Sequence, residues 1–192
     1  MAQYPELYVL RHGQTEWNVA KRYQGRKDSP LTALGMEQAE AQGRILKREL
    51  GARRLPCFTS PQLRAFRTAE IALAAIGQVA EPDDRLQEVG FGDWEGKTRA
   101  EIEAERAAQP LLSQSHRIYT SPTGESLPEL LARGESFLAT ISAPSVIVSH
   151  GIMSSIIRGL WLRMEPAEMM DLPHGQGCVY HLRNGEEACL TE

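Results

Sequence analysis

Short apolar runs alternate along this chain with longer segments whose apolar residues recur at helical spacing. The clearest short run is Ser145–Ser149 (SVIVS), which fits a buried strand. The clearest helical pattern begins at Thr32, a good N-cap, and ends at Gly51. Its face is formed, at spacings of 4, 3 and 4 residues, by Ala39, Gly43, Leu46 and Leu50. This alternation predicts an α/β fold, a doubly wound and mostly parallel sheet with helices on both faces.

Cap and turn signals mark the other predicted elements. Ser60 suits a helix N-cap and Pro61 the first position of that helix, whose apolar residues are Leu63, Phe66, Leu73 and Ile76. Ser126 and Glu129 form a capping-box pattern for a helix that ends near Ile141. The remaining predictions are strands at Glu6–Leu10, Leu55–Phe58 and Cys178–Arg183, extended chain at 79–87, helices at 98–108 and Ile152–Leu160, and a tight turn at Asn184-Gly185 into a last short strand. Without a linker or repeat, residues 1–192 are predicted to form a single domain, with a variable segment at about 97–124 that covers the site.

Composition argues against several classes of protein. The 192 residues carry a formal net charge of −4, whereas nucleic-acid binders usually show a basic excess. No apolar run reaches about 18 residues, so no membrane span is expected. The N-terminal residues also lack the pattern of a secretory signal. Three cysteines are too few for a disulfide scaffold and lack metal-ligand spacing, so the cytoplasm is the expected compartment and no cysteine-built zinc site is expected.

Reactive side chains follow three of the predicted strands at the point where each strand ends. Arg11-His12 follows the first strand, Ser60 with Arg64 follows the second, and His150-Gly151 follows Ser145–Ser149. Ligands of open α/β sheets bind beyond the carboxyl ends of the strands. If these strands are neighbours, two imidazoles and two guanidiniums converge on one crevice. Glu88, at the start of a glycine-rich loop, could join them.

This set of side chains suits the transfer of a phosphoryl group. Two arginines can bind phosphoryl oxygens in fork geometry, and the helix that starts at Gly151 would point free backbone N–H groups at the same anion. A neutral imidazole is a capable nucleophile, and neighbouring positive charge should lower the pKa of a histidine. A carboxylic acid such as Glu88 could protonate the leaving alcohol. These parts need no metal or other cofactor.

Each candidate also has an ordinary structural interpretation. Arg-His-Gly and Ser-His-Gly occur by chance in many proteins, Arg64 could be a solvated helical residue, and Glu88 could be an ordinary loop carboxylate. Other carboxylates near Glu88 are Asp84, Asp93 and Glu95. A metal hydrolase could instead use His12, His150, His174 and His181, but no two of them have helical ligand spacing. The position of all candidates at strand ends favours one common site.

Five sequence blocks follow one another from residue 7 to residue 151. They are LYVLRHGQTEWN continuing through QGRKDSPLTALG, then SPQLRAFRTAE, LQEVGFGDWEG, PTGES and VIVSHG. In this order the blocks resemble those of the histidine phosphatase superfamily, in its phosphoglycerate mutase-like branch, which includes small broad-specificity phosphatases. Arg-His-Gly alone is weak evidence, whereas five ordered blocks are a specific match. The resemblance implies a doubly wound α/β sheet, largely parallel with one antiparallel strand.

The resemblance also implies a role for each matching residue. His12 would be the nucleophile that becomes phosphorylated, and Glu88 would be the proton donor and then the base that activates water. The other residues would bind the phosphoryl group: Arg11, Arg64 and His150 in the transition state, and Asn18, Gln24 and Gly25 in the rest of the phosphate pocket. A backbone carbonyl would hold the second ring nitrogen of the nucleophile and fix its tautomer.

Members of this family include both hydrolases and mutases. Mutases generally carry a longer insertion with arginines for the substrate carboxylate, and a C-terminal lid. Residues 97–124 are short and contain no paired arginines, and Glu186–Glu192 are too few for a lid. Gln24-Gly25 also looks more like the phosphatase branch. We therefore expect a metal-independent phosphomonoesterase of the histidine acid phosphatase type, with mutase chemistry and a non-catalytic phosphate-binding protein on the same fold as alternatives.

The expected partner is a small phosphorylated metabolite, with no nucleic acid and no membrane. A homodimer stays an open alternative. His116, Arg117 and Tyr119 lie in the variable segment and either contact substrate or form a solvated loop. Lys21, Arg22, Arg26 and Lys27 form a basic cluster that either steers anionic substrates or is an ordinary wet surface.

Overall fold

The structure is a computed structural model that describes residues 4–108, 121 and 123–192. A six-stranded sheet lies at its centre, in the order β3-β2-β4-β1-β5-β6. The strands are β1 (Leu7–Arg11), β2 (Cys57–Thr59), β3 (Glu81–Pro82), β4 (Ser145–Ser149), β5 (Val179–Arg183) and β6 (Glu186–Leu190). The pairs β1–β4, β4–β2 and β2–β3 are parallel, whereas β5 is antiparallel to both of its neighbours. The predicted α/β sheet with one antiparallel strand is confirmed.

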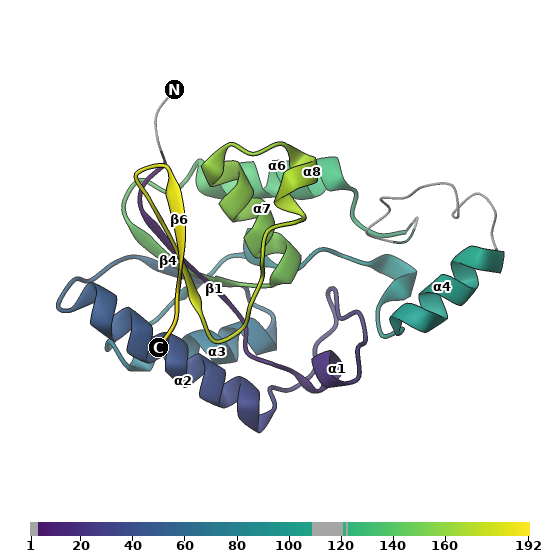
Figure 1. Ribbon diagram of the computed structural model, residues 1–192, viewed down its shortest axis with the longest axis horizontal. Helices are drawn as coiled ribbons and strands as arrows, with labels where there is room; N and C mark the ends of the chain where they lie inside the picture. Colours follow the sequence, from purple (N-terminus) through teal and green to yellow (C-terminus); the bar gives the residue numbers. More distant parts are fainter. Residues whose placement is uncertain (1–3, 109–120, 122) are drawn as a thin grey trace.

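Helices cover both faces of the sheet (Figure 1). On one face lie α2 (Ala33–Leu50) and α3 (Leu63–Ala74), and on the other lie α6 (Leu127–Leu138), α7 (Gly151–Leu162) and α8 (Pro166–Met169). The short α1 (Glu16–Val19) follows β1, and α4 (Arg99–Ala108) stands out at one side of the molecule. Two single-turn helices, η1 (Asp84–Leu86) and η2 (Gly92–Trp94), lie in the connection between β3 and α4.

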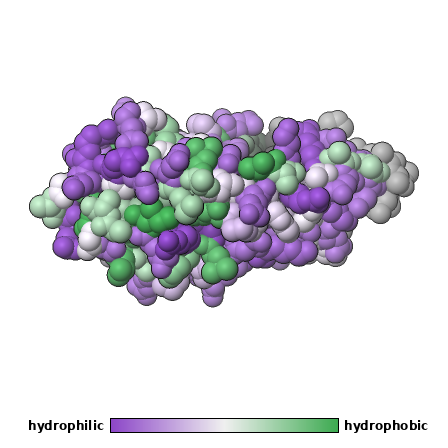
Figure 2. Space-filling view, turned by 90° about the horizontal axis from the view of Figure 1, so that it is seen from below, coloured by the Kyte–Doolittle hydropathy of each residue, from purple (hydrophilic) through white to green (hydrophobic). Residues whose placement is uncertain are grey.

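The core consists of two apolar layers, one on each face of the sheet. Along β1, Leu7 and Val9 pack into the layer beneath α6 and α7, while Tyr8 and Leu10 pack into the layer beneath α2 and α3. Burial on both faces explains why the central strands read as continuous apolar runs. Figure 2 shows the outer surface from the side of α2 and α3, where hydrophobic spots are interrupted by hydrophilic residues. Among the described residues, no helix has the length and apolar character needed to cross a bilayer.

Several predicted boundaries are confirmed. The α2 helix starts after Thr32, whose hydroxyl accepts from the Gly35 N–H, and stops before Gly51. The capping box of Ser126 and Glu129 opens α6 as predicted. Asn184 and Gly185, with φ values of 55° and 85°, form the turn between β5 and β6. In these places the deciding residues are close in sequence, so a local pattern is sufficient.

The predicted start of α3 is wrong. The helix begins at Leu63 with Gln62 as N-cap, and not with Ser60 and Pro61 as N-cap and first helical position. Asp28 is responsible, because its carboxylate accepts from the backbone N–H of Leu63 at 2.7 Å and replaces the expected local cap. Leu63 is also 71% exposed instead of buried, and the core face of α3 is formed by Ala65, Ala69, Ala72 and Leu73.

Other predictions changed in extent; for example, the helix expected to end near Ile141 ends at Leu138. The strand expected at Leu55–Phe58 is Cys57–Thr59, and the extended stretch at 79–87 holds only the two residues of β3 before η1 begins. The variable segment at about 97–124 contains α4. The predictions for His116, Arg117 and Tyr119 lie outside the described residues.

Candidate active site

The register of the central strands places the two predicted histidines side by side. Arg11 is paired with Ser149 across the β1–β4 ladder, so both strands end at the same level. The His12 N–H then donates to the Ser149 carbonyl at 2.9 Å. The rings of His12 and His150 meet edge to face, with centroids 5.2 Å apart.

A cavity of about 260 Å³ opens at this edge of the sheet. It brings together most of the predicted site residues. Those that line it are Arg11, His12, Asn18, Gln24, Gly25, Arg64, Glu88 and Gly151. The cavity therefore lies at the carboxyl ends of the strands, where the sequence predicts the site.

His12 is buried, with 2% of its surface exposed. Its Nδ1 lies 2.7 Å from the Gly13 carbonyl oxygen, which can only accept. Nδ1 therefore carries the hydrogen, and in the neutral ring Nε2 keeps its lone pair. Burial lowers the pKa of His12 well below its ordinary value of 6.5, and the charges of Arg11 and Arg64 lower it further. The expected influence of positive charge is present, but burial is the larger cause.

His150 is fully buried and is not among the residues that line the cavity. Its Nε2 is 2.7 Å from the Ser60 hydroxyl, while its Nδ1 has no hydrogen-bond partner among the described residues. Burial lowers the pKa of His150 well below 6.5, with Arg64 and His12 as further causes. The ring is therefore neutral at neutral pH.

The two predicted arginines are held by protein groups. Arg11 donates through Nη1 to the His174 carbonyl at 2.6 Å. Arg64 donates through Nη1 to Lys27 and Asp28 and through Nη2 to the Gly25 carbonyl, at 2.7 to 2.8 Å. Only the edge of the Arg64 guanidinium that contains Nε can therefore face a bound anion. The sequence predicted that the whole fork of Arg64 would be free for phosphoryl oxygens, and these contacts correct that prediction. In both arginines Nε is buried without a partner among the described residues.

Glu88 occupies the N-terminus of α7. Its carboxylate accepts from the backbone N–H groups of Val89, Ile152 and Met153, at 3.1, 3.3 and 3.0 Å. The prediction that this helix end points free N–H groups at the substrate is wrong for Ile152 and Met153. An internal carboxylate has taken the place of the expected anion, because a helix N-terminus stabilises negative charge of either origin.

Asn18, Gln24 and Gly25 form one wall of the cavity. The Asn18 side chain accepts from Gln176 at 3.2 Å. Both ends of the Gln24 amide are occupied, by Thr15 and Ser29. Gly25 has a φ of 55°, a left-handed conformation that suits glycine.

Two residues that line the cavity were not predicted from the sequence. Tyr23 and Ile152 line the cavity next to the predicted Gln24 and Gly151. Tyr23 packs edge to face on Phe91, with centroids 4.9 Å apart. Proximity in sequence to the predicted residues is the signal that could have identified both. Asp28 was missed because nothing local in the sequence connects it with Arg64.

The described residues contain no group of three or more histidine, cysteine, aspartate or glutamate side chains that could hold a metal ion. Of the histidines considered for a metal site, His181 lies away from the cavity, where it stacks on Tyr8 and binds Glu6 at 2.7 Å.

Two curated proteins illustrate what this chain resembles. A glucosyl-3-phosphoglycerate phosphatase of Mycobacterium tuberculosis (strain CDC 1551 / Oshkosh) is 33% identical over 175 residues, which cover 84% of this chain and 77% of that protein. A 2,3-bisphosphoglycerate-dependent phosphoglycerate mutase of Methylobacterium sp. (strain 4-46) is 39% identical over 193 residues, which cover 92% and 91%. Both hydrolases and mutases thus occur among the relatives.

Solved structures share the whole fold. A mycobacterial glucosyl-3-phosphoglycerate phosphatase in complex with VO3 superimposes with a TM-score of 0.79 and 29% identity, over 98% of this chain and 97% of that one. The family model of the histidine phosphatase superfamily (branch 1) matches residues 7–191. With this match over nearly its full length, the chain belongs to the histidine phosphatase superfamily.

Proposed function

We propose that this protein is a metal-independent phosphomonoesterase that hydrolyses a small phosphorylated metabolite through a phosphohistidine on His12. One observation carries the proposal. Three buried nitrogens lack partners among the described residues: Arg11 Nε, Arg64 Nε and His150 Nδ1. The two guanidinium nitrogens are donors, and His150 Nδ1 is a donor when its Nε2 accepts from the Ser60 hydroxyl. A buried donor left unpaired costs about 1–3 kcal/mol, so such a set calls for a ligand with several acceptor oxygens. A phosphoryl group is such a ligand, and the lone pair of His12 Nε2 is available beside it.

In the first step, the lone pair of His12 Nε2 attacks phosphorus and the bond from phosphorus to the ester oxygen breaks. Glu88 enters this step protonated and donates its proton to the departing oxygen, so the leaving group is a neutral alcohol. Arg11, Arg64 and His150 stabilise the charge on the transferring oxygens. The cavity wall of Asn18, Gln24, Gly25 and Gly151 completes the phosphate pocket.

In the second step, water attacks the phosphorus of phosphohistidine. Glu88, now a carboxylate, takes a proton from that water, and the bond from phosphorus to Nε2 breaks. Inorganic phosphate leaves and His12 returns to its neutral form. Every proton in the two steps is carried by Glu88, water or substrate, so the proposal needs no metal.

Steady-state release of inorganic phosphate in the presence of EDTA tests the proposal. Turnover should persist after the enzyme has been dialysed against EDTA, and full dependence on an added metal ion would overturn metal independence. Glycerol phosphates, phosphoglycerates, sugar phosphates and nucleotides form the first substrate panel.

Mutase chemistry is the second candidate, favoured by the mutase that is 39% identical to this chain. Gln24-Gly25 and the lack of paired arginines at 97–124 in the sequence support hydrolysis instead. Isomerisation of 3-phosphoglycerate with negligible phosphate release would decide for the mutase.

A non-catalytic phosphate-binding protein is the third candidate. It would form no phosphohistidine when incubated with substrate and quenched in alkali.

We also propose that the protein works in the cytoplasm, where thiols stay reduced, because Cys57, Cys178 and Cys189 are free in the structure. The proposed partner is the small phosphorylated substrate. Light scattering of the purified protein distinguishes the monomer from the homodimer left open by the sequence.

A further inference from the structure

Arg133 on α6 reaches across to the chain segment that carries Glu88. Its Nη1 donates to the backbone carbonyls of Arg85 and Gln87, both at 2.7 Å. Its Nη2 lies 3.5 Å from the carbonyl of Glu88 itself. A single guanidinium thus binds the backbone at three positions up to and including Glu88.

Glu125 completes this bridge from the other side. Its carboxylate receives a two-point ion pair from Nε and Nη2 of Arg133, both at 2.8 Å. It also accepts from the Gly90 N–H at 3.2 Å. Both partners of the ion pair have side chains only 14% exposed. Arg133 and Glu125 therefore fix the backbone both before and after Glu88.

The side chain of Glu88 is aimed by a different set of contacts. Three backbone N–H groups bind its carboxylate, two of them from α7. These contacts can fix the direction of the Glu88 side chain only if the backbone of Glu88 is held at the right distance from α7. Gln62 anchors the Glu88 N–H at 2.7 Å, and Arg133 anchors the carbonyl side. Proton transfer needs heavy atoms within about 2.6–3.2 Å, so a small shift of this backbone is enough to impair it.

We propose that Arg133, held by Glu125, is a positioning residue that places Glu88 for proton transfer to the leaving group. This inference rests on the proposed phosphatase function. Arg133 does not line the cavity and touches Glu88 only through the main chain. Its removal should therefore affect the proton-transfer step and spare the binding of phosphate.

Arg133→Met tests the proposal on two substrates with different leaving groups. Phenethyl phosphate releases a poor alkoxide that needs a proton, whereas p-nitrophenyl phosphate releases a phenolate that needs little help. The ratio kcat/KM reports only steps up to the first irreversible one, so water attack does not enter. We expect kcat/KM to fall about 10- to 100-fold for phenethyl phosphate and less than about 3-fold for p-nitrophenyl phosphate.

Arg85→Met is the matched control. Arg85 also connects this segment with α6, through the Ser136 carbonyl at 2.8 Å, but its side chain donates to none of the residues from 87 to 90. Its loss should lower kcat/KM for both substrates equally and by less than about 3-fold. Arg133→Lys keeps the positive charge and a single donating nitrogen, so it should retain part of the activity on phenethyl phosphate that Arg133→Met loses.

A double-mutant cycle shows whether the effect passes through Glu88. In a Glu88→Gln background, Arg133→Met should produce no further loss on phenethyl phosphate. Equal losses on both substrates, or a full additional loss in the Glu88→Gln background, would overturn the positioning role. If Arg133→Met does not fold, Arg133→Lys and Glu125→Gln carry the same comparison. Absence of phosphatase activity in the unmodified protein would instead refute the proposed function.

Discussion

His12 and His150 lie with their ring centroids 5.2 Å apart at an interplanar angle of 61°. The parallel pairing of Arg11 with Ser149 produces this relationship, because each histidine is the next residue after its strand. Neither ring can become charged without disfavouring charge on the other, and both have a pKa well below 6.5. Two neutral imidazoles surrounded by arginines form the centre of the site.

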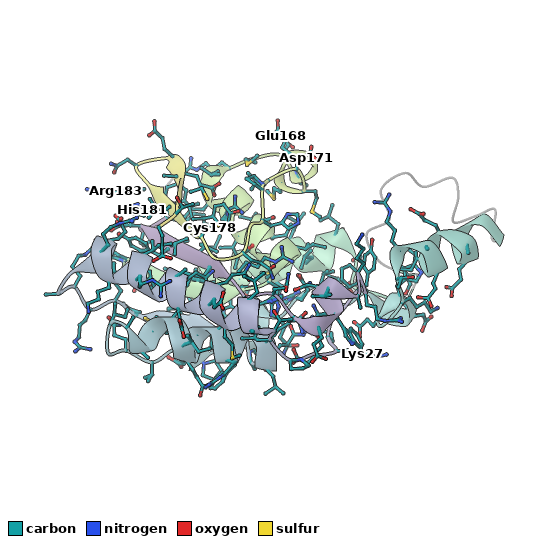
Figure 3. All side chains as sticks on the ribbon, turned by 60° about the horizontal axis from the view of Figure 1, so that its bottom comes forward. Lys27, Glu168, Asp171, Cys178, His181 and Arg183 are labelled. Carbon is teal, nitrogen blue, oxygen red and sulfur yellow. The ribbon has the colours of Figure 1, made fainter. Side chains whose placement is uncertain are left out.

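His12→Ala should abolish turnover and the phosphoenzyme together. Removing the nucleophile deletes the covalent step, so activity should fall by at least about 10³-fold. Rapid-quench trapping with radiolabelled substrate should show an acid-labile, alkali-stable phosphoenzyme in the unmodified protein and none in the variant. His181→Ala is a suitable control, since His181 does not line the cavity and is well separated in Figure 3 from Lys27, whose carbonyl accepts from Arg64. Persistent phosphoenzyme in His12→Ala would assign the nucleophile elsewhere.

Glu88→Gln should discriminate between leaving groups. The amide keeps the shape of the side chain but cannot donate an acidic proton, so the loss on alkyl phosphates should reach about 10²-fold or more. Aryl phosphates should lose less in kcat/KM because their leaving groups need less protonation. An equal loss on both classes would remove Glu88 from the role of acid.

The stability of the protein should fall as the pH drops below 6.5. The unfolded chain protonates both histidines near that pH, whereas in the folded state burial keeps His12 and His150 neutral to a much lower pH. The unfolded state therefore binds more protons in this window, and the free energy of unfolding should decrease by up to about 1.4 kcal/mol per pH unit for each histidine. Urea unfolding between about pH 5.5 and 7.5 measures this slope. His12→Asn should reduce it, and an unchanged slope in that variant would contradict the explanation.

Asp28 should be needed for both stability and phosphate binding. Its carboxylate caps the N–H groups of Leu63 and Arg64 and pairs with the Arg64 guanidinium at 2.7 Å. Asp28→Ala leaves a buried guanidinium without its counter-charge and should cost about 2–4 kcal/mol of unfolding free energy. KM should rise as Arg64 loses its fixed position. Asp171→Ala is the control, because Asp171 is exposed in the turn that follows α8. A KM unchanged by Asp28→Ala would show that the carbonyl contacts alone hold Arg64.

Lys21 should contribute to the capture of substrate. It lines the cavity and has a φ of 53°, so Lys21→Asn removes the charge while keeping a residue that tolerates this conformation. KM should rise about 3- to 10-fold at low salt with kcat unchanged, and the difference should shrink as salt screens the charge. Lys27→Asn is the matched control, because Lys27 is exposed and donates to the Glu95 carbonyl instead of lining the cavity. Equal effects of both variants would indicate steering by total charge.

Local patterns predicted the elements whose determinants are near in sequence. Thr32 and Gly51 bound α2, and Ser126 with Glu129 opens α6, because a cap acts within one helical turn. The start of α3 could not be predicted in this way. Its cap, Asp28, is 35 residues away and meets the helix only after the chain has folded.

The membership of the site was more predictable than its hydrogen bonding. Strand ends brought His12, Arg64 and His150 into one place, as the order of the motifs implies. Which donors stay free depends on contacts between distant segments. The Glu88 carboxylate accepts from backbone N–H groups that are 64 and 65 residues away in sequence. The Nη groups of Arg64 donate to Gly25, Lys27 and Asp28. Such competition for donors has no signature in a linear pattern.

The antiparallel direction of β5 has a consequence for how this pocket can change. A strand that runs against its neighbours has its beginning, and not its end, at the edge where β1 and β4 finish. The segment that enters β5 therefore supplies His174, whose carbonyl holds Arg11, and Gln176, whose amide binds the His12 carbonyl at 3.1 Å. The segment before β5 is therefore a separate stretch of chain from the loops that follow β1, β2 and β4. Its length and side chains can vary while those three loops keep their sequence, as long as the His174 carbonyl and the Gln176 amide still hold Arg11 and His12.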